Sequence, residues 1–312
     1  MKLLVQPDQG ITPIVSAIKK AQRTVQAMIF RADLAEVQQA LESAVGRGVA
    51  VHTLIAHTNR GGEKRLRKLE QALLEAGVTV SRTGDDLVRY HGKMMIIDRR
   101  TLFVMGFNMT HLDALASRSF AVVTRHKKLV QEALKLFDSD ATRQPYVPGL
   151  ETFVVSPDNS RQQLTAFIKG ATKQLLIYDP KIADRPVIRL LQERAKNGVD
   201  IRVLGKVTTK AEGVLVEKLP KLRLHVRAIL RDGRHLFVGS QSLRPLELDR
   251  RREVGVIVRA DDVVKQFQTV FEADWALTDL ARKAAKKEKK HEKDDDDAQE
   301  KGDGHADAAA AK

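Results

Sequence analysis

A sparse polar pattern occurs twice in this chain, and each of its four positions is displaced by 134 residues (225 − 91). The two copies read His91-x-Lys93-x4-Asp98 followed by Asn108, and His225-x-Arg227-x4-Asp232 followed by Ser242. Packing does not require a histidine with a cation two residues later. The repeat therefore sets the architecture of the chain and is the first clue to its chemistry.

The repeat extends well beyond the two motifs. Without a gap, residues 117–123 fall on residues 251–257, and residues 137–140 fall on residues 271–274. Upstream, a displacement of 150 superposes Pro7-Asp8 on Pro157-Asp158. The chain is thus a duplicated unit whose first copy carries 16 extra residues (150 − 134), located between Gly48 and His91.

Length and composition favour two modest domains. A chain of 312 residues predicts roughly two domains of ~150 residues, each with its own core. We expect a first domain at 1–143, a Pro- and Gly-containing linker at 144–150 and a second domain at 151–280. Residues 281–312 are charged, with few apolar side chains, and predict a disordered tail beyond a short helical extension.

The chain contains no cysteine, which excludes disulfides and thiolate chemistry and suits a reducing compartment. The apolar run in the first residues is too short for a signal peptide, and no stretch of ~18 uncharged apolar residues occurs. We therefore expect a cytoplasmic protein.

The net charge of +14 belongs entirely to residues 1–280. The tail holds nine Lys/Arg and nine Asp/Glu, which leaves 45 basic groups (54 − 9) against 31 acidic groups (40 − 9). A basic body favours polyanionic partners, either nucleic acid or an anionic membrane surface. The alternative is an ordinary well-solvated Lys/Arg-rich surface.

Strand and helix patterns alternate in each copy, which predicts an α/β sandwich for each unit. The two motifs lie at the start of strand–turn–strand segments, such as 94–97 and 102–105 in the first copy. The other expected strands are 2–6, 24–30, 49–55, 119–123, 152–155, 174–178, 200–204, 227–230, 235–239 and 254–258. The expected helices are 11–21, 34–47, 63–76, 127–137, 160–171, 186–196 and 263–275.

Two paired histidines and cations suit the cleavage of a phosphodiester. One imidazole can attack phosphorus to form a phosphohistidine, while the other protonates the leaving oxygen and then activates water or an alcohol. Lys93 and Arg227 would neutralise the phosphoryl oxygens, with Asn108 and Ser242 as further donors. This scheme needs no metal or cofactor, and it places the site between the two halves.

The paired His-x-Lys-x4-Asp signatures, each followed by a Gly-Ser-x-Asn-like segment, resemble the phospholipase D superfamily, and the resemblance covers roughly residues 1–280. Segments 224–229 and 237–243 are similar to bacterial members described as phospholipase D-like or cardiolipin synthase-like. The resemblance implies two tandem α/β sandwich domains related by a pseudo-twofold axis, with the active site at their interface. It also implies that His91 is the nucleophile and His225 the acid/base, although the internal symmetry does not distinguish them.

The chain departs from the family pattern at several positions. Arg227 replaces the usual lysine, Ser242 replaces the usual asparagine, and Ser119 stands where the second copy has the acidic Glu253. Arg227 keeps its charge but presents a planar fork. Glu253 can hold a catalytic imidazole in one tautomer, and its absence at Ser119 predicts that one histidine is less constrained.

Five other residues receive supporting roles. Asp98 and Asp232 are expected to fix the strand–turn–strand segments by hydrogen bonding. Ser240, Arg244 and Arg252 are candidates for gripping an anionic substrate, and a solvated basic loop is the alternative for the arginines.

Three classes of function remain. The first is a phospholipid phosphodiesterase or phosphatidyltransferase in peripheral contact with an anionic membrane, at its inner face. The second is a metal-independent endonuclease, favoured by the net charge and disfavoured by the 4% aromatic content. The third is a catalytically weakened protein that binds phosphate ligands. The alcohol on the phosphate, the choice between hydrolysis and transfer, and the oligomeric state stay open.

Overall fold

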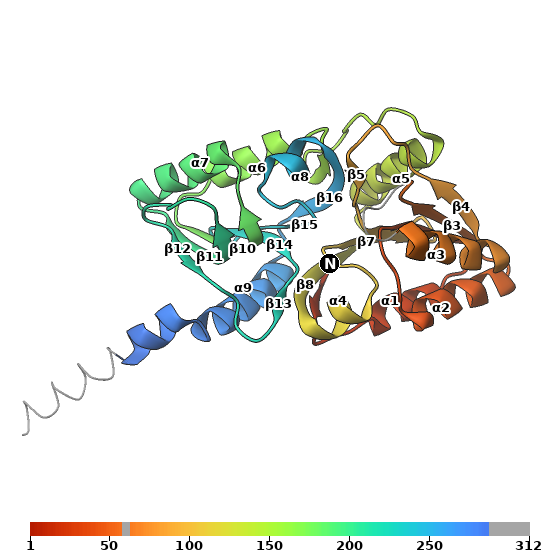
Figure 1. Ribbon diagram of the computed structural model, residues 1–312, viewed down its shortest axis with the longest axis horizontal. Helices are drawn as coiled ribbons and strands as arrows, with labels where there is room; N and C mark the ends of the chain where they lie inside the picture. Colours follow the sequence, from red (N-terminus) through yellow and green to blue (C-terminus); the bar gives the residue numbers. More distant parts are fainter. Residues whose placement is uncertain (58–62, 287–312) are drawn as a thin grey trace, which may run out of the picture.

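A computed structural model of the chain describes residues 1–57 and 63–286, and it shows two α/β halves lying side by side (Figure 1). The first half comprises, in chain order, β1 (Lys2–Gln6), α1 (Thr12–Lys19), β2 (Thr24–Ile29), α2 (Ala35–Gly46), β3 (Ala50–Ile55), α3 (Glu63–Glu75), β4 (Thr79–Arg82), β5 (Arg89–Tyr90), β6 (Met94–Ile97), β7 (Thr101–Met105), α4 (His111–Ala116), β8 (Ser117–Thr124) and α5 (Lys127–Thr142). The second half comprises β9 (Phe153–Ser156), α6 (Ser160–Lys169), β10 (Gln174–Ile182), α7 (Arg185–Lys196), β11 (Asp200–Val207), β12 (Leu215–Glu217), β13 (Arg223–Leu224), β14 (Arg227–Arg231), β15 (His235–Gly239), α8 (Pro245–Asp249), β16 (Arg251–Val258) and α9 (Asp261–Ala276).

The two sheets have the same strand order, as the duplication predicts. In the described residues the first sheet runs β4-β3-β2-β6-β7-β8-β1, and the second runs β12-β11-β10-β14-β15-β16-β9. The strands at one end, β2-β3-β4 and β10-β11-β12, are parallel, whereas the motif-bearing hairpins β6–β7 and β14–β15 are antiparallel. The expected α/β sandwich is therefore found in both halves.

Each sheet is completed by a two-residue strand from the opposite half. β13 of the second half pairs parallel with β8, and β5 of the first half pairs parallel with β16. Since each strand directly precedes a motif histidine, the two crossings bring both motifs to the interface between the halves.

One hydrophobic core is shared by the halves, and two others are local. The shared core combines one face of each sheet with α5 and α9, and includes the aromatic group of Phe120, Tyr178, Phe267 and Phe271. Helices α1, α2 and α3 cover the outer face of the first sheet, and α6, α7 and α8 cover that of the second. Because the interface is part of the main core, relative movement of the two sheets would expose apolar surface.

The turns of the two motif hairpins contain residues whose backbone lies in the left-handed region of φ and ψ. Asp98 and Arg99 both have φ 52°, and Asp232 and Gly233 have φ 54° and 62°, as the two central residues of a mirror-image β-turn require. The Asp98 carboxylate accepts backbone N–H groups of residues 22–24, and Asp232 accepts those of residues 172–174. The expected hydrogen bonding of both aspartates is confirmed, and it ties each turn to the start of β2 or β10.

The sixteen extra residues of the first copy correspond mainly to α3, which was expected at 63–76 and has no counterpart between β11 and β13.

Residues 144–150, the expected linker, contain neither helix nor strand. In the expected tail, residues 281–286 belong to a helical segment that begins at residue 279, and residues 287–312 lie outside the described residues. None of the described helices is long and apolar enough to cross a membrane.

Candidate active site

Both motif histidines stand at the junction of a crossing strand and a motif hairpin. The backbone N–H of His91 donates to the Arg252 carbonyl oxygen at 2.8 Å, and that of His225 donates to the Arg118 carbonyl oxygen at 3.2 Å. Each histidine is therefore anchored to the last long strand of the opposite half. The two imidazoles line one cavity of about 450 Å³.

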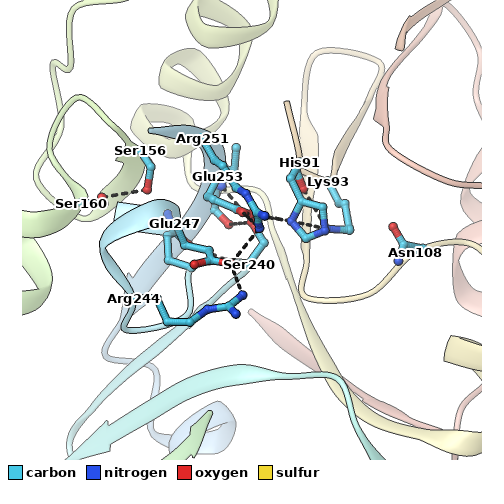
Figure 2. Close-up of polar contacts among 12 residues, drawn as sticks. His91, Lys93, Asn108, Ser156, Ser160, Ser240, Arg244, Glu247, Arg251 and Glu253 are labelled. Atoms are coloured by element: carbon cyan, nitrogen blue, oxygen red, sulfur yellow. Dashed lines mark hydrogen bonds and ion pairs between the residues drawn. The ribbon is translucent and has the colours of Figure 1, made fainter. Parts of the chain in front are cut away.

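The His91 imidazole is held by a carboxylate of the second half. Its Nδ1 lies 2.8 Å from Oε2 of Glu253 (Figure 2). The ring also packs against Phe30 in a T-shaped contact, with 4.4 Å between the ring centroids. Donation from Nδ1 to the carboxylate leaves the lone pair on Nε2. Burial and the nearby charge of Lys93 lower the pKa of His91 well below its usual value. A neutral imidazole, as a nucleophile requires, is thus favoured.

The His225 imidazole lies beside a carboxylate of the first half. Its Nδ1 is 3.1 Å from Oδ2 of Asp113, within ion-pair distance but without the alignment of a hydrogen bond, and the other oxygen of Asp113 contacts Arg223 at 2.6 Å. Burial lowers the pKa of His225 to about 4, and Asp113 opposes this shift. Burial also opposes ionisation of Asp113, but contacts with His225, Asn108 and Arg223 together hold its pKa well below the usual range.

These pairings correct one expectation from the sequence. Glu253 belongs to the second copy but holds His91 of the first, and His225 has a carboxylate beside it, Asp113, at ion-pair distance. Asp113 was missed by the sequence analysis. The signal was present, however, since displacement by 134 places Asp113 on another acidic residue, Glu247.

The two motif cations are buried beside the histidines. Lys93 is 2% exposed, and its Nζ lies 3.2 Å from His91 Nε2 and 2.7 Å from the His91 carbonyl oxygen. Burial lowers the pKa of Lys93 to about 7, which Glu253 opposes. Arg227 is 8% exposed, and its Nε and Nη1 have no hydrogen-bond partner in the described part of the chain. A buried guanidinium with unused donors is suited to an anion.

The two residues expected to add donors use their polar groups internally. Asn108 lines the cavity, its Nδ2 donates to Asp113 Oδ2 at 2.8 Å, and its Oδ1 is buried without a partner among the described residues. Ser242 is fully buried, and its hydroxyl donates to Asp179. The expected donation from Ser242 to a phosphate is therefore wrong for this arrangement, since its proton is already shared with a carboxylate.

The three candidates for gripping a substrate are also placed elsewhere. Ser240 is fully buried, and its Oγ accepts the Val254 backbone N–H. Arg244 pairs with Glu247, and Arg252 is enclosed by Asp140 and Asp158 (Figure 2 shows Ser240, Arg244 and Glu247). Each of these side chains is therefore committed to a contact within the protein.

Other cavity-lining residues come mainly from the first half. Arg31, Arg89 and Arg223 contribute cationic groups, and Phe30, Leu66, Leu69 and Leu112 contribute apolar surface. Glu247, the residue of the second half that is equivalent to Asp113, binds both Arg244 and Arg251. The two halves therefore contribute unequally to the wall of the cavity. Within the described residues, no three His, Asp or Glu side chains are grouped so as to hold a metal ion.

Comparisons with known proteins agree with this arrangement. The family described as "Cardiolipin synthase, PLD-like domain" matches residues 14–141 and 164–275, one segment in each half. No curated protein matches the chain.

Solved structures share the fold. Polyphosphate kinase from Porphyromonas gingivalis superposes with a TM-score of 0.73 at 18% identity, over 88% of this chain and 50% of that one. This chain thus spans half the length of that kinase. Phosphatidylserine synthase from Haemophilus influenzae Rd KW20 superposes with a TM-score of 0.66 at 12% identity, over 88% of this chain and 86% of that one. With two repeats matched and a histidine pair at their interface, the chain belongs to the phospholipase D-like family that includes the cardiolipin synthase domain.

Proposed function

We propose that this protein is a phosphodiesterase of the phospholipase D type, which cleaves or transfers phosphatidyl groups of phospholipids through a phosphohistidine. The observation that carries the proposal is the arrangement of His91 and His225 around one cavity, each with its Nδ1 on a carboxylate of the opposite half. With both Nδ1 atoms beside carboxylates, we assign Nε2 of each ring to the substrate, as nucleophile in His91 and as proton carrier in His225, with Lys93 close to the first.

The first step forms a bond between His91 Nε2 and phosphorus while the bond from phosphorus to the leaving alkoxide breaks. His225 gives the alkoxide its proton from Nε2, and the Asp113 carboxylate stabilises the imidazolium before the transfer. Burial lowers the pKa of His225, and the charge of a bound phosphate would oppose that shift as Asp113 does. Lys93 and Arg227 balance the charge on the phosphoryl oxygens.

The second step reverses these roles. Neutral His225 takes a proton from water or an alcohol, the oxygen attacks phosphorus, and the bond to His91 Nε2 breaks. Water gives hydrolysis and an alcohol gives transfer.

A phospholipid fits the cavity better than a nucleic acid. Its wall offers leucines for apolar atoms and arginines for anionic groups, and the body of the chain carries the charge that an anionic bilayer attracts. Single-stranded nucleic acid would be held by aromatic platforms, yet Phe30 is the one aromatic ring among the lining residues that the structure describes, and it is 4% exposed. We therefore place the reaction at a membrane surface, with the protein bound peripherally.

The test compares substrates under one set of conditions. Purified protein in EDTA is assayed on anionic phosphatidylglycerol liposomes, on single- and double-stranded DNA, and on a chromogenic phosphodiester. We expect lipid turnover without DNA cleavage. DNA cleavage without lipid turnover would select the nuclease, and no turnover of any substrate would leave a protein that binds phosphate ligands.

The charge of Lys93 should set the alkaline limb of the pH profile. Its pKa of about 7 means that the ammonium is charged below that pH and neutral above it, so kcat/KM should fall as pH rises through 7. In Lys93→Arg the guanidinium stays charged, and the falling limb should disappear below pH 9. The profile is measured with the chromogenic diester, and an unchanged limb in the variant would assign it to another group.

A further inference from the structure

Behind the cavity, Arg118 of β8 links the two halves through a buried contact. Its guanidinium makes two parallel hydrogen bonds to Asp274 of α9, Nε to Oδ2 at 2.8 Å and Nη2 to Oδ1 at 3.0 Å. Nη1 donates to the Gln6 carbonyl oxygen at 2.9 Å and lies 3.4 Å from Asp8. The hydroxyl of Tyr178 completes the group by donating to Asp274 at 2.6 Å.

The repeat-equivalent residue, Arg252 of β16, makes the mirror contact. Its Nη2 lies 3.1 Å from Asp140 of α5, Nη1 donates to the Ser156 carbonyl oxygen at 3.0 Å, and Nη1 also pairs with Asp158. Displacement by 134 relates Arg118 to Arg252 and Asp140 to Asp274, and displacement by 150 relates Asp8 to Asp158. In each case an arginine of one half binds a helix of the other. We call these two groups the Arg118 clasp and the Arg252 clasp.

Each clasp arginine also carries the carbonyl group that anchors a motif histidine. Arg252 O accepts the His91 backbone N–H, and the next residue, Glu253, holds the His91 ring. Arg118 O accepts the His225 backbone N–H, in the short pairing of β13 with β8. A shift of either strand would therefore move the histidine of the opposite half.

A gain in the stability of the fold is a weak explanation for the two clasps. Arg118 and Arg252 are 8% and 5% exposed, and a buried ion pair is often no more stabilising than apolar residues of similar volume. What an ion pair of fixed geometry adds is a defined register between the elements it joins.

We propose that Arg118 and Arg252 are positioning residues for the reaction, in which the Arg252 clasp aligns His91 and the Arg118 clasp aligns His225. This assignment rests on the proposed function. The roles of the two clasps are separable when the leaving group needs no proton. With a nitrophenyl diester the Arg252 clasp governs formation of the phosphohistidine, and the Arg118 clasp governs its decay.

The two clasps are not equally complete. In the Arg118 clasp both oxygens of Asp274 are bonded. In the Arg252 clasp, Asp140 Oδ2 and Arg252 Nε have no hydrogen-bond partner within the described chain, although the guanidinium lies 5.7 Å from the Tyr90 ring and 5.9 Å from the Tyr146 ring. Conservative changes should therefore disturb the alignment of His91 more readily than that of His225.

The experiment uses Arg118→Lys, Arg252→Lys, Asp274→Asn and Asp140→Asn in the full chain, because lysine keeps the charge without the two-pronged geometry. Formation and decay of the phosphohistidine are followed in single turnovers of a chromogenic diester. We expect Arg252→Lys and Asp140→Asn to slow formation by about tenfold to hundredfold, as a small misplacement of a reacting group does. Arg118→Lys and Asp274→Asn should slow decay instead, so that the intermediate accumulates.

Arg161→Met is the matched control. Arg161 pairs with Asp184 and Asp249 within the second half, and its loss removes ion pairs without touching β8 or β16. Its single-turnover rates should equal those of the unaltered protein. Equal effects of the two clasps on both steps, or rates in every folded clasp variant that match Arg161→Met, would overturn the proposal.

A second readout does not need turnover. In protein labelled with ¹⁵N-histidine, Arg252→Lys should shift the imidazole resonances of His91 and leave those of His225, and Arg118→Lys should do the reverse. If the unaltered protein turns over no substrate but this selective pattern is found, the proposed function fails while the positional role of the clasps stands. Resonances of both histidines that do not move in either variant contradict that role.

Discussion

His91→Ala should lower kcat/KM on lipid and on the chromogenic diester by about 10⁴-fold or more, because without this imidazole no covalent intermediate forms. Loss of the ring also leaves the buried Glu253 carboxylate without its partner, so thermal melting must show that the variant is folded. Steady-state kinetics and mass spectrometry of quenched enzyme measure the effect, and the phosphoryl adduct should map to His91 in the unaltered protein.

His126→Ala is the control for this change. His126 is exposed and precedes α5 without a side-chain capping bond, so its removal should leave the rate unchanged. If His91→Ala keeps more than a tenth of the activity, or if the adduct maps to His225, the assignment of the nucleophile is contradicted.

His225→Ala should lower the rate on lipid by about 10²- to 10⁴-fold, because a poor alkoxide leaving group needs a proton and the later attack needs a base. A nitrophenolate leaves without a proton, so the chromogenic diester should restore the first step. The second step still lacks its base. The variant should therefore give a burst of nitrophenol equal to the enzyme concentration and then stall as the phosphohistidine.

A stopped-flow trace tests this directly. The absence of a burst, with lipid and chromogenic rates lowered equally, would show that His225 supports the site in another way than by proton transfer. Lowered rates together with a slow continuous release would place the rate-limiting step before the covalent intermediate. Either result contradicts the role given to His225 here.

Much of the fold could be predicted because its signals are local. The long strands and helices of both halves were found from their apolar periods, and the duplication fixed the common order of elements. The crossing strands β5 and β13 were missed, since two residues carry no period and their partners lie in the other half. The helices α4 and α8 were missed because they are also too short to show an apolar period.

The site was predictable in part. The two histidines and their cations follow from the repeated motif, and the structure places both histidines on one cavity with Lys93 beside His91. The role given to Ser242 rested on its match to Asn108 in the repeat, and that given to Arg252 on closeness in sequence. Burial beside Asp179 and Asp140 decides what those side chains do. The exchange of carboxylates between halves was hidden because a pairing across 162 residues leaves no trace in either local sequence.

The two copies differ in how they use the acidic positions of the repeat. Each repeat has two places from which a carboxylate can reach the opposite histidine, represented by Asp113 and Glu253. Of the equivalent places, one has become Ser119 and the other, Glu247, now joins Arg244 to Arg251. The cavity wall comes mainly from the first half. The two ends of a phosphodiester lying between the histidines would therefore meet different surroundings, and the internal symmetry of the chain does not extend to the substrate.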